Sequence, residues 1–124
     1  MLAKDIKELV KRIKNFYQSS DPLEIIKKRK IIHSFLGDSS LCKSSVEGMD
    51  GIYFESQGVK FILINPDLDD HRAKIAYASN LGHAILHPDV NIFSLKDVTG
   101  YNIEKYIKEA DIFAAELLLD DYIF

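Results

Sequence analysis

Two short β-rich runs in the middle of the chain leave room for only a small sheet. Residues 51–55 and 59–65 are rich in β-branched and aromatic side chains, and a three-residue stretch ending in Gly58 separates them. This pattern predicts an antiparallel hairpin in which Gly58 takes the positive φ of a tight turn. Pro66 should end the second strand, because proline has no N–H to donate to a strand ladder.

Helical periodicity surrounds this hairpin on both sides. Apolar residues recur at intervals of three and four over 2–17, 70–87 and 102–119, and each stripe predicts an amphipathic helix with that stripe packed inward. The stripes comprise Leu2, Ile6, Leu9, Val10, Ile13, Phe16 and Tyr17 in the first segment, Ile75, Ala78, Leu81, Ile85 and Leu86 in the second, and Ile103, Tyr106, Ile107, Ala110, Phe113, Ala114, Leu117 and Leu118 in the third. Helices flanking a small hairpin predict an α+β fold. The length fits a single domain over residues 1–124.

Local signals place a further short helix before the hairpin. Asp21 offers an N-cap acceptor, Pro22 fixes φ in the first turn, and Glu24 supplies the acid of a capping box. We expect this helix to end near Lys30. Residues 37–50, rich in Gly, Ser and Asp, are expected to form an irregular connection with at most a short strand.

Composition narrows the class of protein. The 16 basic and 19 acidic residues give a formal net charge of −3, so no direct binding to nucleic acid is expected. No segment approaches the run of about 20 apolar residues that crosses a bilayer, and the N-terminus lacks the apolar region of a signal peptide. The single cysteine, Cys42, has no partner for a disulfide and no Cys/His pattern for structural zinc, and we interpret it as an incidental thiol. A cytoplasmic protein without membrane contact is predicted.

Basic residues are concentrated in the first quarter of the chain, whereas the last quarter is acidic. The basic set comprises Lys4, Lys7, Lys11, Arg12, Lys14, Lys27, Lys28, Arg29 and Lys30. We interpret it as the solvated outer faces of the two N-terminal helices, and a basic surface for a partner is the alternative.

Polar residues on the last two predicted helices lie in positions that suit metal chemistry. The stretch ASNLGHAILH contains His83 and His87, and EADIFAAELLL contains Glu109. In helical zinc peptidases, two histidines four residues apart face the same side, a glutamate base follows the first histidine, and another segment supplies the third ligand.

These two segments carry a resemblance to a known family. From about residue 64 to 119, the chain resembles the ImmA/IrrE metallopeptidases, known for a helix with the sequence histidine, glutamate, leucine, glycine, histidine. Leu81, Gly82 and His83 match that motif in KIAYASNLGHAILHPDVN, and His87 matches a common trailing histidine. The segment EADIFAAELLL is similar to the one that carries the family's third zinc ligand, so the resemblance places Glu109 at that ligand.

Two departures from the family motif affect the chemistry directly. Ser79 stands at the first zinc histidine, and Asn80 stands at the catalytic glutamate. A serine hydroxyl is a weak neutral ligand, and an asparagine amide has no carboxylate to accept a proton. We therefore expect zinc to be absent or weakly bound and peptide bonds to be left intact. If these two residues were introduced by engineering, the parent would be an active zinc peptidase.

Alternative interpretations of the surviving polar residues stay open. His83 and His87 are themselves four residues apart and could form a shifted metal site with Glu109, although Ala84 rather than a glutamate follows His83. Otherwise His83 would hydrogen-bond within the core, His87 would interact with the dipole at a helix C-terminus, and a lone acid such as Glu109 would be solvated.

The resemblance implies a regulatory function. ImmA/IrrE relatives are commonly carried by phages and mobile elements beside a helix-turn-helix repressor, which the active members cleave or control. A catalytically inactive, metallopeptidase-like member is expected to bind a protein partner, either such a repressor or a host factor. One alternative is a zinc-dependent metallo-endopeptidase with a residual site at His83, His87 and Glu109. Another is a chain whose acidic C-terminal end docks onto a separate partner. The sequence indicates no oligomeric state.

Overall fold

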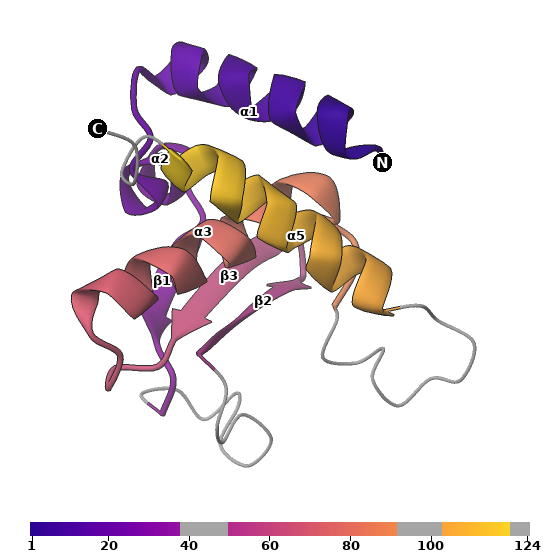
Figure 1. The fold of residues 1–124 in the computed structure, drawn as a ribbon. Helices are drawn as coiled ribbons and strands as arrows, with labels where there is room; N and C mark the ends of the chain where they lie inside the picture. The colour runs from indigo at the N-terminus through magenta and orange to yellow at the C-terminus, as the bar shows by residue number, and fades with distance from the viewer. Residues whose placement is uncertain (38–49, 92–102, 120–124) are drawn as a thin grey trace.

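The computed structural model describes residues 1–37, 50–91 and 103–119 and contains four helices and a three-stranded sheet in that part of the chain (Figure 1). The elements follow the order α1 (Ala3–Tyr17), α2 (Pro22–Lys28), β1 (Ile32–Phe35), β2 (Gly51–Ser56), β3 (Val59–Ile64), α3 (Asp70–Leu86) and α5 (Ile103–Leu118). This architecture confirms the predicted α+β class. Cys42, most of the predicted connection at 37–50 and the acidic residues at 120–124 lie outside the described residues.

N-cap side chains mark the start of two helices. Asp21 accepts a hydrogen bond from the backbone N–H of Leu23 at 3.0 Å, and Asp69 accepts one from the backbone N–H of Arg72 at 2.8 Å. Each contact satisfies a donor that the first helical turn leaves without a partner, so α2 and α3 begin where their N-cap residues stand.

The sheet has the strand order β1-β3-β2. The predicted hairpin of β2 and β3 is confirmed as antiparallel, and its two-residue turn has positive φ at both Gln57 (51°) and Gly58 (80°), as a type I′ turn requires. The sequence pattern did not predict β1, which pairs with β3 in parallel, starting with Ile32 opposite Phe61. The sheet is therefore mixed rather than purely antiparallel.

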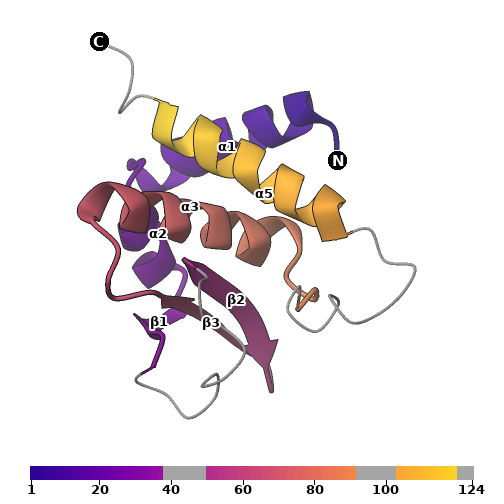
Figure 2. The ribbon, with the colours of Figure 1, turned by 60° about the horizontal axis from the view of Figure 1, so that its bottom comes forward.

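The helices lie on one side of this sheet in successive layers. Helix α3 packs on β2 and β3, α5 packs on α3, and α1 packs on the far side of α5 (Figures 1 and 2). The core between these layers contains Ile6, Val10, Ile25, Ile26, Ile62, Ile64, Leu81, Phe113 and Leu117. No helix in the described ranges is long and apolar enough to cross a membrane.

Some residues of the predicted apolar stripes are not packed inward. Leu2 is 63% exposed and Phe16 is 79% exposed, while Ile75 and Ile107 are partly exposed at 40% and 39%. Helix α1 contacts the rest of the molecule mainly through α5, so only a narrow stripe is covered. Since each residue turns the helix by about 100°, the Phe16 side chain points away when its neighbour Tyr17 packs against the core.

Candidate functional site

A close crossing of α3 and α5 brings the candidate site residues together. A Cβ atom added at Gly82 would lie 3.1 Å from Cβ of Phe113 and 3.2 Å from Cα of Ala110. The absence of a side chain at Gly82 therefore lets the two helix backbones approach each other. This approach places the C-terminal end of α3, with its two histidines, beside Glu109 on α5.

His87 is the central residue of this site. It is the C-cap of α3, and its backbone N–H donates to the carbonyl of His83 at 2.8 Å. Its ring Nε2 lies 2.7 Å from Oε1 of Glu109, and its Nδ1 lies 3.4 Å from Nδ1 of His83. The sequence-predicted residues His83, His87 and Glu109 thus form one hydrogen-bonded chain, in which Glu109 contacts His87 and not His83.

Burial strengthens the hydrogen bonds among these three side chains. His87 is only 6% exposed and Glu109 8% exposed. The ring of Tyr106 packs edge-on against His87 with a centroid distance of 4.7 Å. Hydrogen bonds between buried groups count for more than exposed ones, because water does not compete for them. No buried side-chain nitrogen or oxygen among the described residues lacks a hydrogen-bond partner.

Electrostatics indicate the charge states of the site. Burial disfavours the charged form of His83, and the neighbouring His87 adds to this effect, so the pKa of His83 is lowered to about 4. Burial opposes ionisation of Glu109, but hydrogen bonds from the Met1 ammonium, 2.7 Å away, and from His87 outweigh it, so the pKa of Glu109 is lowered. At neutral pH the site therefore contains a neutral His83 and an ionised Glu109.

These charge states restrict the proton positions. Because Glu109 is a carboxylate, Nε2 of His87 donates its proton to Oε1. Only one of the two facing Nδ1 atoms, on His83 and His87, can carry a proton in their contact, since two donors would repel. The hydrogen-bonded side chains can thus hold one proton between the two imidazole rings or pass it from one ring to the other.

Ser79 and Asn80 do not hydrogen-bond to His83, His87 or Glu109 in the structure. The Ser79 hydroxyl donates to the carbonyl of Ala76 at 3.3 Å, and Nδ2 of Asn80 donates to the same carbonyl at 2.8 Å. Asn80 is buried, and strand β2 passes so near it that a Cβ atom at Gly51 would lie 3.0 Å from Nδ2. Both side chains therefore form hydrogen bonds with the backbone of their own helix.

The donor atoms of this site only partly match the geometry of a zinc site. Two nitrogen ligands of a tetrahedral zinc stand about 3.3 Å apart, and the facing Nδ1 atoms of His83 and His87 are separated by 3.4 Å. Glu109, however, is bound to the opposite nitrogen of His87, and its second oxygen is held by Met1. In the ranges that the structure describes, no group of three His, Cys, Asp or Glu residues is arranged to hold a metal ion. As they lie, these residues do not fit a three-ligand zinc site.

Two contacts of the site were missed by sequence reasoning. Tyr106 was assigned to the apolar stripe, although its position three residues before Glu109 on the same helix was a signal that it lies near the site. No sequence signal connects Met1 with Glu109, because they are 108 residues apart and meet only through the packing of α1 on α5.

Comparison with known proteins gives two matches. Residues 40–124 match the family model described as the IrrE N-terminal-like domain. The chain is also 31% identical over 118 residues to immunity region protein 2 of Bacillus phage phi105, and the aligned part covers 95% of this chain and 70% of that relative. No solved structure matches the chain. The family match includes α3 and α5 and therefore the whole set of candidate site residues.

Proposed function

The chain belongs to the ImmA/IrrE family, whose IrrE N-terminal-like domain it carries, and from this premise we propose that it is a non-catalytic member that binds and regulates a protein partner. The observation that carries the proposal is the pair Ser79 and Asn80 at the positions where the family resemblance implies a zinc histidine and a glutamate base. Both side chains hydrogen-bond to the backbone carbonyl of Ala76 in α3.

The chemistry of these side chains supports the loss of peptidase activity. An asparagine amide cannot accept a proton from water, and loss of a general base alone lowers a rate by about 10²- to 10⁴-fold. The serine hydroxyl is a poor substitute for an imidazole ligand. Glu109, which the resemblance places at the third ligand, already has hydrogen-bond partners for both oxygens in His87 and Met1. The site is therefore satisfied by groups of the protein itself.

The kind of partner follows from the family and from the phage relative. That relative is named as a protein of an immunity region, and the family resemblance implies a helix-turn-helix repressor encoded beside the gene. We propose that this chain binds such a repressor, or a host factor, through the retained fold without cleaving it.

Zinc content and partner integrity test this proposal together. The protein, purified without chelator, is compared by elemental analysis with the double variant Ser79→His, Asn80→Glu. Each is then incubated with the neighbouring helix-turn-helix repressor, and the intact mass of the repressor and its co-elution with the chain are measured. We expect little zinc, an uncut repressor and a stable complex for the natural chain, and about one zinc per chain for the double variant. Cleavage of the repressor by the natural chain would overturn the proposal.

A residual metal-dependent hydrolase is the second candidate. The 3.4 Å separation of the Nδ1 atoms of His83 and His87 favours it, because it suits two ligands of one zinc ion. Glu109 would then remain on Nε2 of His87 as the group that orients the ring, or would have to leave it to become a ligand. This candidate predicts stoichiometric zinc in the natural chain that is lost in His87→Ala, together with hydrolysis that a chelator stops.

A further inference from the structure

The corner between α1 and α2 carries an exposed aromatic side chain beside two arginines. Phe16 is 79% exposed, and its ring contacts Tyr17 edge-on with a centroid distance of 4.9 Å. Nη1 of Arg29 donates to the Tyr17 hydroxyl at 3.1 Å. Together with Arg12 and Ile13, these residues line a surface hollow of about 410 Å³. Phe16 thus presents an apolar ring at the edge of this hollow that the described part of the chain leaves mostly uncovered.

The two arginines differ from their lysine neighbours in how they are paired. Both lysines form ion pairs: Nζ of Lys11 lies 3.8 Å from Oε1 of Glu8, and Nζ of Lys28 lies 3.0 Å from Oε1 of Glu24. Within residues 1–37, 50–91 and 103–119, neither Arg12 nor Arg29 forms an ion pair with a carboxylate. Their guanidinium groups are therefore available to a partner, and a guanidinium binds carboxylates with two parallel hydrogen bonds.

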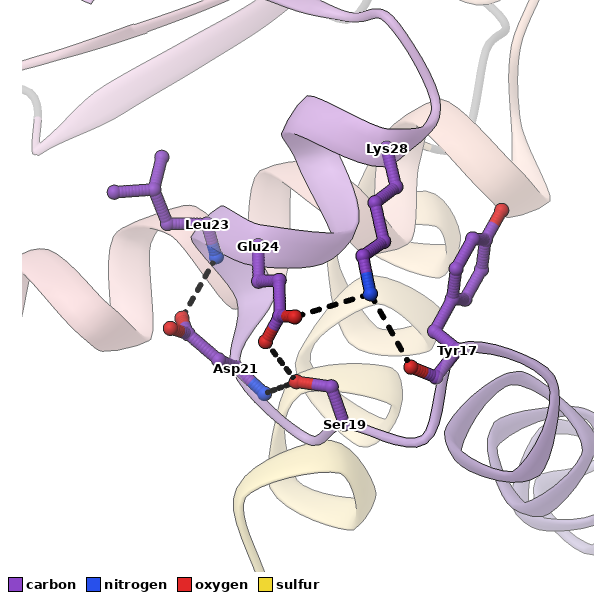
Figure 3. Close-up of polar contacts among 6 residues, drawn as sticks. All are labelled: Tyr17, Ser19, Asp21, Leu23, Glu24 and Lys28. Carbon is purple, nitrogen blue, oxygen red and sulfur yellow. Dashed lines mark hydrogen bonds and ion pairs between the residues drawn. The ribbon is translucent and has the colours of Figure 1, made fainter.

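A local hydrogen-bond network joins α2 to the end of α1 at Tyr17, which is one of the residues that line the hollow (Figure 3). The Ser19 hydroxyl accepts from the backbone N–H of Asp21 at 3.0 Å and donates to Glu24 at 2.7 Å. Nζ of Lys28, which pairs with Glu24, also contacts the backbone carbonyl of Tyr17 at 3.5 Å. The end of α1 is thus tied to α2, so little order has to be gained when a partner binds.

We propose that this corner, lined by Arg12, Phe16, Tyr17 and Arg29, is a docking site for a protein segment that combines acidic residues with an aromatic or aliphatic side chain. The apolar side chain would lie against Phe16, and the carboxylates would pair with Arg12 and Arg29. Aromatic residues and arginine are the types that most often dominate protein interfaces.

Charge supports a protein partner over nucleic acid. The first quarter of the chain is basic, whereas the whole chain has a net charge of −3, so positive charge is local and its complement is a local acidic segment. A nucleic acid duplex is negatively charged along its whole length and would also meet the remaining acidic surface, whereas a short acidic segment need contact only this corner. The inference rests on the proposed function for the existence of a protein partner. It does not depend on the chemistry at His83, because Phe16 lies near the opposite end of the 15-residue α1 from Met1, about 20 Å away along the axis.

The test is selection from a display library of random 12-residue peptides on the full chain, followed by binding measurements with the enriched peptides. We expect peptides rich in Asp and Glu with at least one aromatic or aliphatic residue. Their dissociation constants should rise about tenfold or more in Arg12→Glu and in Phe16→Ala, both at exposed side chains whose replacement leaves the fold intact. Lys4→Glu and Lys27→Glu make the same change of charge as Arg12→Glu at exposed positions elsewhere on α1 and α2, and these controls should bind much as the natural chain does.

Three results would overturn this inference. The selection yields no enriched peptide, or the enriched peptides bind Arg12→Glu and Phe16→Ala unchanged, or the natural chain binds a 20-base-pair DNA duplex in a manner that Arg12→Glu abolishes. A fourth result, a repressor that still co-elutes with Arg12→Glu, would likewise overturn the docking site but would leave the proposed function standing. A repressor that is cleaved would contradict the proposed function without bearing on the peptide result.

Discussion

Nε2 of His87 lies 2.7 Å from Oε1 of Glu109, and this contact joins the C-terminal end of α3 to the middle of α5. Both side chains are buried, and both helices contribute to the same core. The position that the family resemblance assigns to a zinc ligand is therefore used here as a hydrogen-bond acceptor for a histidine. Changes at this contact should therefore alter the stability of the protein.

Glu109→Ala should lower the free energy of unfolding by about 2 kcal/mol, because it leaves the buried Nε2–H of His87 without an acceptor. The measurement is urea unfolding at pH 7, with Glu104→Ala as the control at an exposed position of the same helix. The control should change stability by no more than about 0.5 kcal/mol. Equal stability of the two variants would show that the His87 contact contributes little.

Stability should fall as the pH is lowered from about 6.5 towards 4. The pKa of His83 is about 4 in the folded chain, below its ordinary value of 6.5, so the unfolded chain binds more protons in this range. The loss attributable to His83 is on the order of 3 kcal/mol. It is measured by comparing unfolding free energies of the natural chain and His83→Gln between pH 7 and pH 4. Parallel curves for the two proteins would contradict the assignment.

Most of the fold could be predicted because its signals are local. Asp21 and Asp69 cap their helices through contacts two and three residues away, and Gly58 lies in a two-residue turn. Strand β1 has no such signal, since it is four residues long and its partner Phe61 lies 29 residues beyond Ile32. The pairing is set by the packing of the whole molecule, which periodicity does not report.

The site could be predicted as a set of residues but not as a set of contacts. Motif spacing placed His83 and His87 on one helix and Glu109 on another, and the structure brings all three together. Which nitrogen of His87 faces Glu109 depends on how α3 and α5 cross, and the missing side chain at Gly82 permits their close approach. The exposure of Phe16 was missed for a similar reason, because a helical stripe does not show how much of it a neighbouring helix covers.

Asn80→Glu alone should destabilise the protein by about 2 kcal/mol. Nδ2 of Asn80 donates to the Ala76 carbonyl at 2.8 Å in a buried position, and a carboxylate there would face an acceptor without a proton to donate. Thermal unfolding of the single variant and of Ser79→His, Asn80→Glu, with and without zinc, measures this effect. Zinc should raise the melting temperature of the double variant only, because a ligand stabilises the state that binds it. Unchanged stability of Asn80→Glu would mean that the residue at this position is not constrained by its buried contact.

Gly82→Ala should destabilise the protein although alanine favours helix formation. Replacement of glycine by alanine within a helix stabilises that helix by about 1 kcal/mol. The added Cβ at position 82, however, would lie 3.2 Å from both Cα and the carbonyl oxygen of Ala110. These are backbone atoms of α5 that can move only if the helix moves, and overpacking of this kind costs about 1–3 kcal/mol.

The displacement would also separate His87 from Glu109, so the variant should lose part of the stability that Glu109→Ala removes. A double variant, Gly82→Ala with Glu109→Ala, measured by urea unfolding, should therefore be less destabilised than the sum of the two single variants. Additive effects would show that the helix crossing and the His87 contact are independent.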